Sequence, residues 1–149
     1  MLTIITDFNN NEQMFKHYWM PLIIKHPECE FIFTKWNCNF NINRPNAKTY
    51  TCNREDAVIH SKNEWILLSE MNAVPTYATM IYLTSLKNEN ICCNPVWHDY
   101  MPSDKAGLPS NSFTIKKSLY NTSLTMKKYI FATGAKIIND LHVYFIRDT

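Results

Sequence analysis

The stretch NREDAVIHSKNEWILLSEMNAVP, residues Asn53–Pro75, decides how the chain is expected to fold. The run EWILL at Glu64–Leu68 has the length and the apolar character of a buried strand. A polar turn follows it, with a carboxylate at Glu70 and an amide at Asn72. Open α/β sheets bind their ligands at the carboxyl ends of such strands. Glu70 and Asn72 are therefore the best candidates for a functional site.

Length and composition favour one folded domain spanning residues 1–149, since 46% of the residues are hydrophobic and 13% are aromatic. The net charge of +2 is too small to indicate a nucleic acid partner. No apolar run reaches the length of a membrane span, and the N-terminus lacks the pattern of a signal peptide. The abundance of Asn, Ile, Lys and Tyr is typical of the AT-rich genomes of viruses, phages and low-GC microbes. We therefore expect a cytoplasmic location, in the host cytoplasm if the chain is viral.

Hydrophobic periodicity predicts alternating strands and helices in the N-terminal half. The β-branched run in Leu2–Phe8 predicts a first strand that is buried on both faces. Apolar residues at helical spacing follow in Glu12–His26, where Pro21 predicts a kink or a restart of the helix. The next expected elements are a strand at Glu30–Trp36, a strand at Ala47–Cys52, a helix at Arg54–Asn63 and the strand at Glu64–Leu68.

The C-terminal half is expected to continue this order less regularly. Thr76 is a suitable N-cap for a helix at Tyr77–Lys87, and Ile91–Trp97 resembles a fifth strand interrupted by Pro95. His98–Ser112 is expected to be a long irregular loop. Further expected elements are strands at Ser112–Leu119 and Lys127–Thr133, and a helix or strand at Ile137–Arg147. This order predicts an α/β domain with a mostly parallel central sheet and crossover helices.

Several stretches resemble the nucleotide-binding half of a GT-A fold, family-2-like glycosyltransferase. The opening LTIITDFNN resembles that family's first strand and its Asn-bearing loop. The stretch Asn53–Pro75 resembles a second segment of that family. In this segment an Asn is followed by a small helix with Ala, an apolar strand, an acidic tip and a Pro. NDLHVYFIR near the C-terminus resembles the family's acidic pair and the Arg that follows it, the motif that carries the catalytic base. The resemblance implies a three-layer, Rossmann-like GT-A arrangement.

The resemblance also implies a function, the transfer of a sugar from a nucleotide-sugar donor to an unknown acceptor. Glu70 and Asn72 fall on the Asp-x-Asp position that binds Mn²⁺ or Mg²⁺ in the family, where the metal offsets charge on the leaving diphosphate. Asp140 falls on the catalytic base, which deprotonates the acceptor hydroxyl. The residues implied to bind the nucleotide are Thr6, Asp7, Phe8 and Asn53.

A non-enzymatic role is the main alternative. Asn72 supplies no charge to the metal position, and 149 residues are few for the family. Both features favour a viral or phage protein that uses a degenerate α/β scaffold for a structural or partner-binding role.

A zinc site is a further alternative, built from Cys92, Cys93, His98 and Asp99. Adjacent cysteines on a strand point to opposite faces, so both do not easily reach one ion. The five cysteines follow no Cys-x-x-Cys pattern, and reduced, buried thiols are the simpler expectation.

Overall fold

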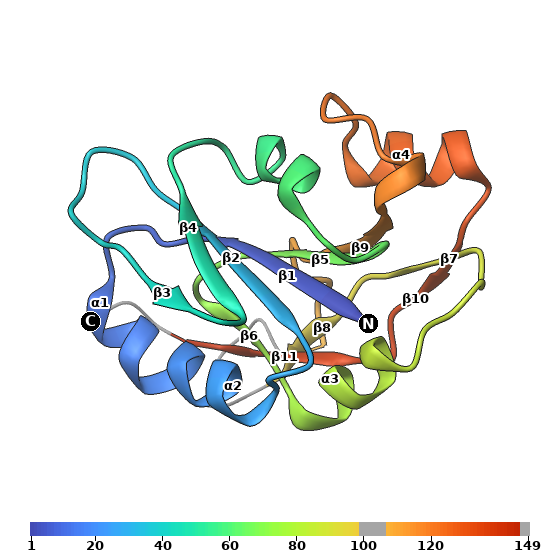
Figure 1. The fold of residues 1–149 in the computed structure, drawn as a ribbon. Coiled ribbons are helices and arrows are strands. Elements are labelled where there is room, and N and C mark those ends of the chain that lie inside the picture. Colours follow the sequence, from blue (N-terminus) through green and yellow to red (C-terminus); the bar gives the residue numbers. More distant parts are fainter. Residues whose placement is uncertain (99–106, 147–149) are drawn as a thin grey trace.

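A six-stranded sheet forms the centre of the structure, a computed structural model that describes residues 1–98 and 107–146. Its strands are β1 Leu2–Asp7, β2 Glu30–Thr34, β3 Asn43–Arg44, β4 Ala47–Tyr50, β5 Trp65–Ser69 and β9 Phe113–Lys116. They are arranged in the order β3-β4-β2-β1-β5-β9 (Figure 1). β1, β2, β4 and β5 run parallel, and the edge strands β3 and β9 are antiparallel to their neighbours. The structure is thus a mixed α/β fold.

Parallel pairing brings the carboxyl ends of the central strands to one edge of the sheet. β1 lies between β2 and β5, with Asp7 opposite Thr34 and Thr6 opposite Ser69. The residues that follow these strand ends are therefore neighbours in space although they are far apart in the sequence.

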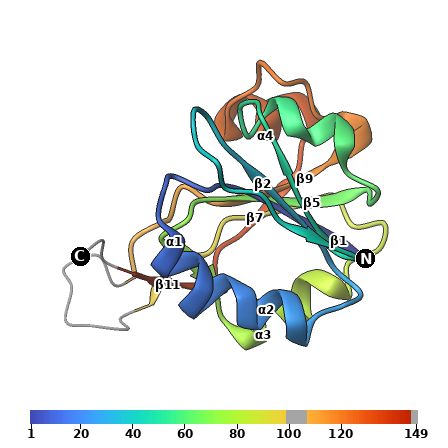
Figure 2. The same ribbon diagram turned by 60° about the vertical axis from the view of Figure 1, so that its left-hand side comes forward.

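Helical segments cover both faces of the sheet. They are α1 Glu12–Met14, η1 Phe15–Trp19, α2 Met20–Lys25, η2 Asp56–His60, α3 Tyr77–Thr84, η3 Lys117–Leu119 and α4 Met126–Thr133. α1, α2 and α3 lie on one side of the sheet, and η2 and α4 lie on the other (Figures 1 and 2). The central strands are sandwiched between these two layers.

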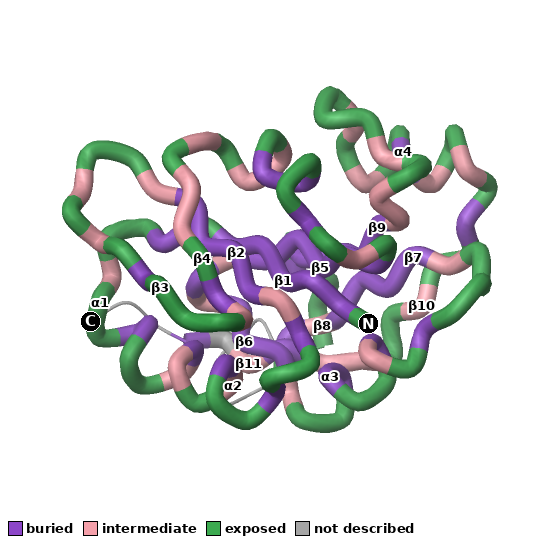
Figure 3. Tube along the Cα trace, viewed as in Figure 1, coloured by how far each residue is buried: buried purple, intermediate pink, exposed green. Residues whose placement is uncertain are grey.

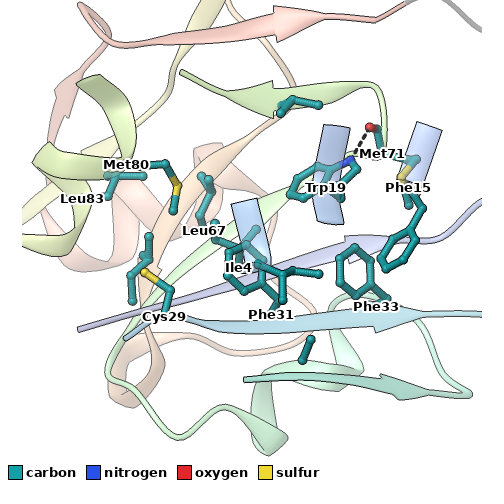
Figure 4. Close-up of a cluster of buried hydrophobic side chains, with 14 of the residues drawn as sticks. Ile4, Phe15, Trp19, Cys29, Phe31, Phe33, Leu67, Met71, Met80 and Leu83 are labelled. Carbon is teal, nitrogen blue, oxygen red and sulfur yellow. Dashed lines mark hydrogen bonds between the residues drawn. The ribbon is translucent and has the colours of Figure 1, made fainter. Parts of the chain in front are cut away.

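Two apolar clusters fill the space between the layers, because neighbouring side chains of a strand point to opposite faces. Ile4 belongs to the cluster on the α1–α3 side, and Ile5 belongs to the cluster on the η2–α4 side. The first cluster includes Phe15, Trp19, Phe31, Phe33, Leu67, Met80 and Leu83 (Figure 4). The second includes Val58, Ile66, Leu68, Ile115 and Tyr129. β1, β2 and β5 are accordingly buried along most of their length (Figure 3).

The first helical region begins and ends as its sequence indicates. The Asn11 side chain accepts a hydrogen bond from the backbone N–H of Met14 and so caps α1. The chain then makes a π-helical turn, η1, and α2 restarts with Pro21 at its first turn. The predicted restart at Pro21 is confirmed.

Two small sheets complete the fold. β6 Ala73–Pro75, β11 His142–Phe145 and β8 Val96–His98 form one, and β10 Lys136–Ile138 and β7 Ile91–Cys93 form the other. The predicted fifth strand is therefore split into β7 and β8 on either side of Asn94 and Pro95, outside the main sheet. The stretch that was predicted as helix or strand after Ile137 forms strands.

The predicted strand at Lys127–Thr133 is wrong, because this segment is helix α4. Thr125 accepts a hydrogen bond from the backbone N–H of Lys128, and Gly134 ends the helix with a φ of 68°. These caps outweigh the β-like content of the segment. The predicted helix at Arg54–Asn63 is shorter and forms the 3₁₀ segment η2. Within the described residues, no helix has the length and apolar character needed to cross a membrane.

Candidate functional site

Two cavities lie side by side at the carboxyl edge of the sheet. The first has a volume of about 270 Å³ and the second about 260 Å³, and both are lined by Asp7 and Asn9 at the end of β1. The first is also lined by Glu70, Met71 and Asn72. The second is also lined by Asn10, Thr34, Lys35, Trp36, Asn53, Arg54 and Glu55. The edge that the sequence predicted as a ligand site is thus hollowed around β1.

Three hydrogen bonds, one within the turn and two to neighbouring segments, fix the turn that carries Glu70 and Asn72. The Ala73 N–H donates to the Glu70 carbonyl (3.0 Å), which closes the turn. Trp19 Nε1 donates to the Met71 carbonyl (2.8 Å; Figure 4). The Ile146 N–H donates to the Asn72 carbonyl (2.9 Å). The turn is therefore held by η1 and by the chain after β11 as well as by its own backbone.

The first cavity presents oxygen ligands of the kind that Mg²⁺ and Mn²⁺ prefer. Asp7 and Glu70 contribute carboxylates, and Asn9 and Asn72 contribute amide oxygens. One carboxylate oxygen of Asp7 accepts from the Thr34 hydroxyl, and Glu70 Oε1 accepts from Asn111 Nδ2 (3.2 Å). No group of three or more His, Cys, Asp or Glu side chains suited to a metal occurs in the described part of the chain. The donor set therefore fits a divalent cation by its chemistry but supplies only two negative charges.

The second cavity brings together cations and an exposed aromatic ring. Trp36, two residues after the end of β2, is 56% exposed. Arg54 Nη1 donates to the Ser69 carbonyl (2.8 Å), and its Nη2 lies 3.2 Å from Glu55 Oε1. Lys35 Nζ donates to the Phe40 carbonyl. An indole face suits a nucleobase, and the cations suit phosphate.

Sequence reasoning missed Lys35, Trp36 and Arg54 as site residues, although it found Asn53. The available signal was their position, since Lys35 and Trp36 directly follow β2 and Arg54 directly follows Asn53. The loop after β1 contributes in the same way, because Asn9 and Asn10 adopt left-handed backbone with φ of 55° and 54°. Asparagine tolerates this conformation better than most residues.

Two of the residues implied to bind the nucleotide point into the core. Thr6 is fully buried, and its hydroxyl has no hydrogen-bond partner among the described residues. Phe8 is 2% exposed and stacks on Phe40 with 3.6 Å between ring centroids. Neither side chain lines the two cavities, because both point toward the buried layer. Of the other two implied residues, Asp7 lines both cavities and Asn53 lines the second.

Asp140 does not join the site. It is exposed in the connection between β10 and β11. Asp140, the residue implied to be the catalytic base, lines neither of the two cavities.

The described residues do not form the zinc site considered from the sequence. Cys92 and Cys93 are fully buried, and burial raises their pKa to about 12 and about 11, so they remain protonated thiols. His98 faces the rings of His142 and Tyr144 at centroid distances of 5.3 and 5.5 Å. Asp99 lies outside the described residues.

Comparison with known proteins relates the chain to solved structures at the level of the fold. It is 11% identical to S. aureus TarS 1-349, over 97% of this chain and 60% of that one, with a TM-score of 0.64. The complex of the same TarS fragment with UDP gives a TM-score of 0.63 at 10% identity, over 96% and 59% of the two chains. A mutant of Drosophila β1,4-galactosyltransferase 7, in complex with manganese, UDP-Gal and xylobiose, gives 0.56 at 9% identity, over 99% and 71%.

The bifunctional IspDF of Campylobacter jejuni is also similar, with a TM-score of 0.55 at 13% identity over 93% of this chain and 48% of that one. No protein-family model matches the chain, and no curated protein sequence matches it. The chain spans about 60% of the TarS fragment and about half of IspDF. Its fold is thus similar to that of GT-A-type glycosyltransferases.

Proposed function

We propose that this chain binds a nucleotide-sugar at the carboxyl edge of its sheet and acts as a glycosyltransferase-like protein. The observation that carries the proposal is the pair of cavities that meet at Asp7 and Asn9, directly after the central strand. One cavity offers hard oxygen ligands, and the other offers an exposed indole and two cations. A nucleoside diphosphate has a base, two phosphates and an affinity for divalent metal, so it is complementary to both.

The two cavities take different parts of the donor in this proposal. Trp36 and Asn53 contact the nucleobase, since an exposed indole provides a stacking face and an amide provides hydrogen bonds. Arg54 and Lys35 lie toward the phosphates. Asp7 and Glu70 hold a divalent cation with the amide oxygens of Asn9 and Asn72. When bound, that cation offsets charge on the diphosphate.

A thermal-shift panel tests this proposal. UDP, GDP and UDP-sugars are added with and without Mn²⁺, and binding to the folded state raises the melting temperature by mass action. A ligand at a hundred times its Kd contributes about 2.7 kcal/mol. We expect a metal-dependent rise that is reduced in Glu70→Ala and in Asp7→Asn. If none of the nucleotides raises the melting temperature, the proposal is refuted.

Donor binding without sugar transfer is a second candidate, favoured by the position of Asp140. Of the carboxylates of the described residues, Asp7, Glu70 and Glu55 line the cavities, and each has another partner or a proposed metal role. Release of UDP from a UDP-sugar, measured with candidate acceptors present, separates the two. Nucleotide binding without turnover favours the non-enzymatic alternative.

A further inference from the structure

Two helices on one side of the molecule, α2 and α3, share an exposed outer face that is largely apolar. They lie side by side in both views of the ribbon (Figures 1 and 2). Lys25 Nζ of α2 lies 4.5 Å from the centroid of the Tyr77 ring at the start of α3, so the two helices are in contact. We call this surface the α2–α3 face. It is formed by the exposed residues Pro21, Ile24, Tyr77, Ala78, Ile81 and Tyr82.

α3 lacks the charged side chains that the outer side of a surface helix normally carries. None of the sixteen residues at 71–86 is charged. Tyr77 is nevertheless 57% exposed and Ile81 is 49% exposed, and Ile24 of the neighbouring α2 is 60% exposed. A helix that is apolar on all sides is normally buried in a larger structure or in a membrane. The α2–α3 face is therefore expected to be covered by a partner.

A recess with apolar walls adjoins this face. Its volume is about 310 Å³, and Pro21, Lys25 and Tyr77 at its border belong to α2 and α3. Leu22 and Val74 contribute aliphatic surface to its lining. Such a recess accommodates an apolar group of the partner, such as part of an acyl chain.

The charges next to the α2–α3 face are positive. Segment 13–27 contains Lys16, His17 and Lys25 but no acidic residue, and Glu12 and Glu28 flank it. Lys16 is exposed, and His17 and Lys25 line the recess, for which no described lining residue is acidic. Apolar side chains enter the boundary between headgroups and acyl chains, while neighbouring lysines contact anionic headgroups. The face therefore has the charge and the apolar character that suit an anionic lipid surface.

A second copy of this chain is a less suitable partner. A symmetric dimer uses the same face on both subunits, so the Lys16 and Lys25 cations of both copies would share one interface. Like charges brought together in an interface weaken association. A membrane that contains anionic lipid presents the opposite charge.

We propose that the α2–α3 face binds the surface of an anionic lipid membrane. Ile24, Tyr77 and Ile81 lie at the headgroup boundary, where tyrosine is a common side chain, and Lys16 and Lys25 contact the headgroups. The site is separate from the proposed donor cavities, because none of these residues lines them. It does not depend on nucleotide binding.

Sedimentation with lipid vesicles tests this proposal, using the full chain without nucleotide. The vesicles contain either phosphatidylcholine alone or an equal mixture of phosphatidylcholine and phosphatidylserine. We expect the bound fraction to rise with the concentration of mixed vesicles and to fall in high salt, because salt screens the lysines. Binding to phosphatidylcholine alone should be about fivefold weaker or more. Failure to bind the mixed vesicles overturns the proposal.

Exposed apolar residues on the two sides of the sheet provide matched variants. Ile81→Asp and Ile24→Asp each place a negative charge on the α2–α3 face and should weaken vesicle binding about tenfold or more. Phe131 of α4, on the opposite side of the sheet, is 93% exposed and follows Lys127 and Lys128 by one helical turn. Phe131→Asp should therefore leave binding unchanged. Thermal unfolding identifies variants that are folded, and either isoleucine variant is sufficient for the test.

Sedimentation velocity without lipid tests the second copy as the partner. We expect no dimer through the α2–α3 face at any protein concentration. The proposal is overturned if folded Ile81→Asp or Ile24→Asp binds mixed vesicles as tightly as the original protein. It is also overturned if Phe131→Asp abolishes binding, or if Ile81→Asp dissociates a dimer of the original protein.

Discussion

Trp19 Nε1 donates a hydrogen bond of 2.8 Å to the carbonyl oxygen of Met71. Trp19 lies in the π-helical turn η1, and Met71 is the central residue of the turn between Glu70 and Asn72. Both residues are almost fully buried, at 0% and 4% exposure. The bond therefore fixes the candidate metal-binding turn to the first helical layer.

Trp19→Phe should destabilise the protein and weaken nucleotide binding together. The substitution removes the indole N–H and leaves the Met71 carbonyl unpaired, at a cost of about 2 kcal/mol. Urea unfolding measures the first effect, and calorimetric titration with UDP and Mn²⁺ measures the second.

Trp65→Phe is the matched control for that variant. Trp65 is 3% exposed, and its Nε1 donates to the Lys87 carbonyl at 2.8 Å, remote from the cavities. It should lower stability without changing nucleotide affinity. Equal loss of affinity in both variants would show that the turn is not specifically supported by Trp19.

Asn72→Asp should strengthen Mn²⁺ binding, because it adds a third carboxylate to those of Asp7 and Glu70 on one cavity. We expect about a tenfold gain in affinity, and Glu70→Gln should give a loss of similar size. Titration of the protein with Mn²⁺, followed by electron paramagnetic resonance, measures both. Glu89→Gln, an exposed carboxylate that does not line the cavities, should have no effect. An unchanged affinity in Asn72→Asp would argue against a metal at this turn.

Thr6→Val should stabilise the protein by about 1 kcal/mol. The Thr6 hydroxyl is fully buried without a partner in the described structure, so an apolar group of the same shape removes a desolvation cost. Thr34→Val is the control, since the Thr34 hydroxyl donates to Asp7 and its loss should not stabilise. Chemical denaturation measures both. A destabilised Thr6→Val would mean that the hydroxyl has a functional or structural partner.

Stability should fall at alkaline pH because of three buried thiols. Burial raises the pKa of Cys29 and Cys92 to about 12 and that of Cys93 to about 11, from an ordinary value of 9.0. Above the ordinary pKa the unfolded chain releases thiol protons that the folded chain keeps. The contribution of these thiols to the unfolding free energy is therefore complete below pH 9. It decreases as the pH rises from 9 to the pKa values of the folded state.

Each thiol should lower the unfolding free energy by about 1 kcal/mol one pH unit above the ordinary pKa. Urea unfolding at several pH values measures the slope of the unfolding free energy against pH. Cys92→Ala removes one of the three thiols and should reduce this slope by the contribution of that thiol. A slope that Cys92→Ala leaves unchanged would assign the alkaline instability to other groups.

The central strands could be predicted because their signal is local. The runs in Leu2–Phe8, Glu30–Trp36 and Glu64–Leu68 are apolar over a strand's length, and burial on both faces requires that composition. α4 was missed because its residues are β-like and its helical signal lies in the caps Thr125 and Gly134. Caps are a weaker sequence signal than periodicity.

The sequence was enough to predict where the site lies, but only some of the residues that line it. Glu70 and Asn72 follow a strand that was predicted, so their place at the sheet edge followed from the fold. The position of Asp140 depends on the pairing of β11 with β6 and β8, which no local pattern reveals. Lys35 and Arg54 reach the same cavity only through the parallel register of β2, β1 and β5. The assignment of 1–149 to a single domain stays a prediction.

If a nucleotide binds around the end of β1, amide NMR of the ¹⁵N-labelled chain should detect it at the residues that line the two cavities. Titration with UDP in the presence of Mg²⁺ should shift the amides of Asp7, Asn9 and Asn53 and the indole N–H of Trp36. The indole signals of Trp65 and the amides of α4 should not move. Shifts confined to other regions, or no saturable shift at any nucleotide concentration, would show that no nucleotide binds at this edge of the sheet.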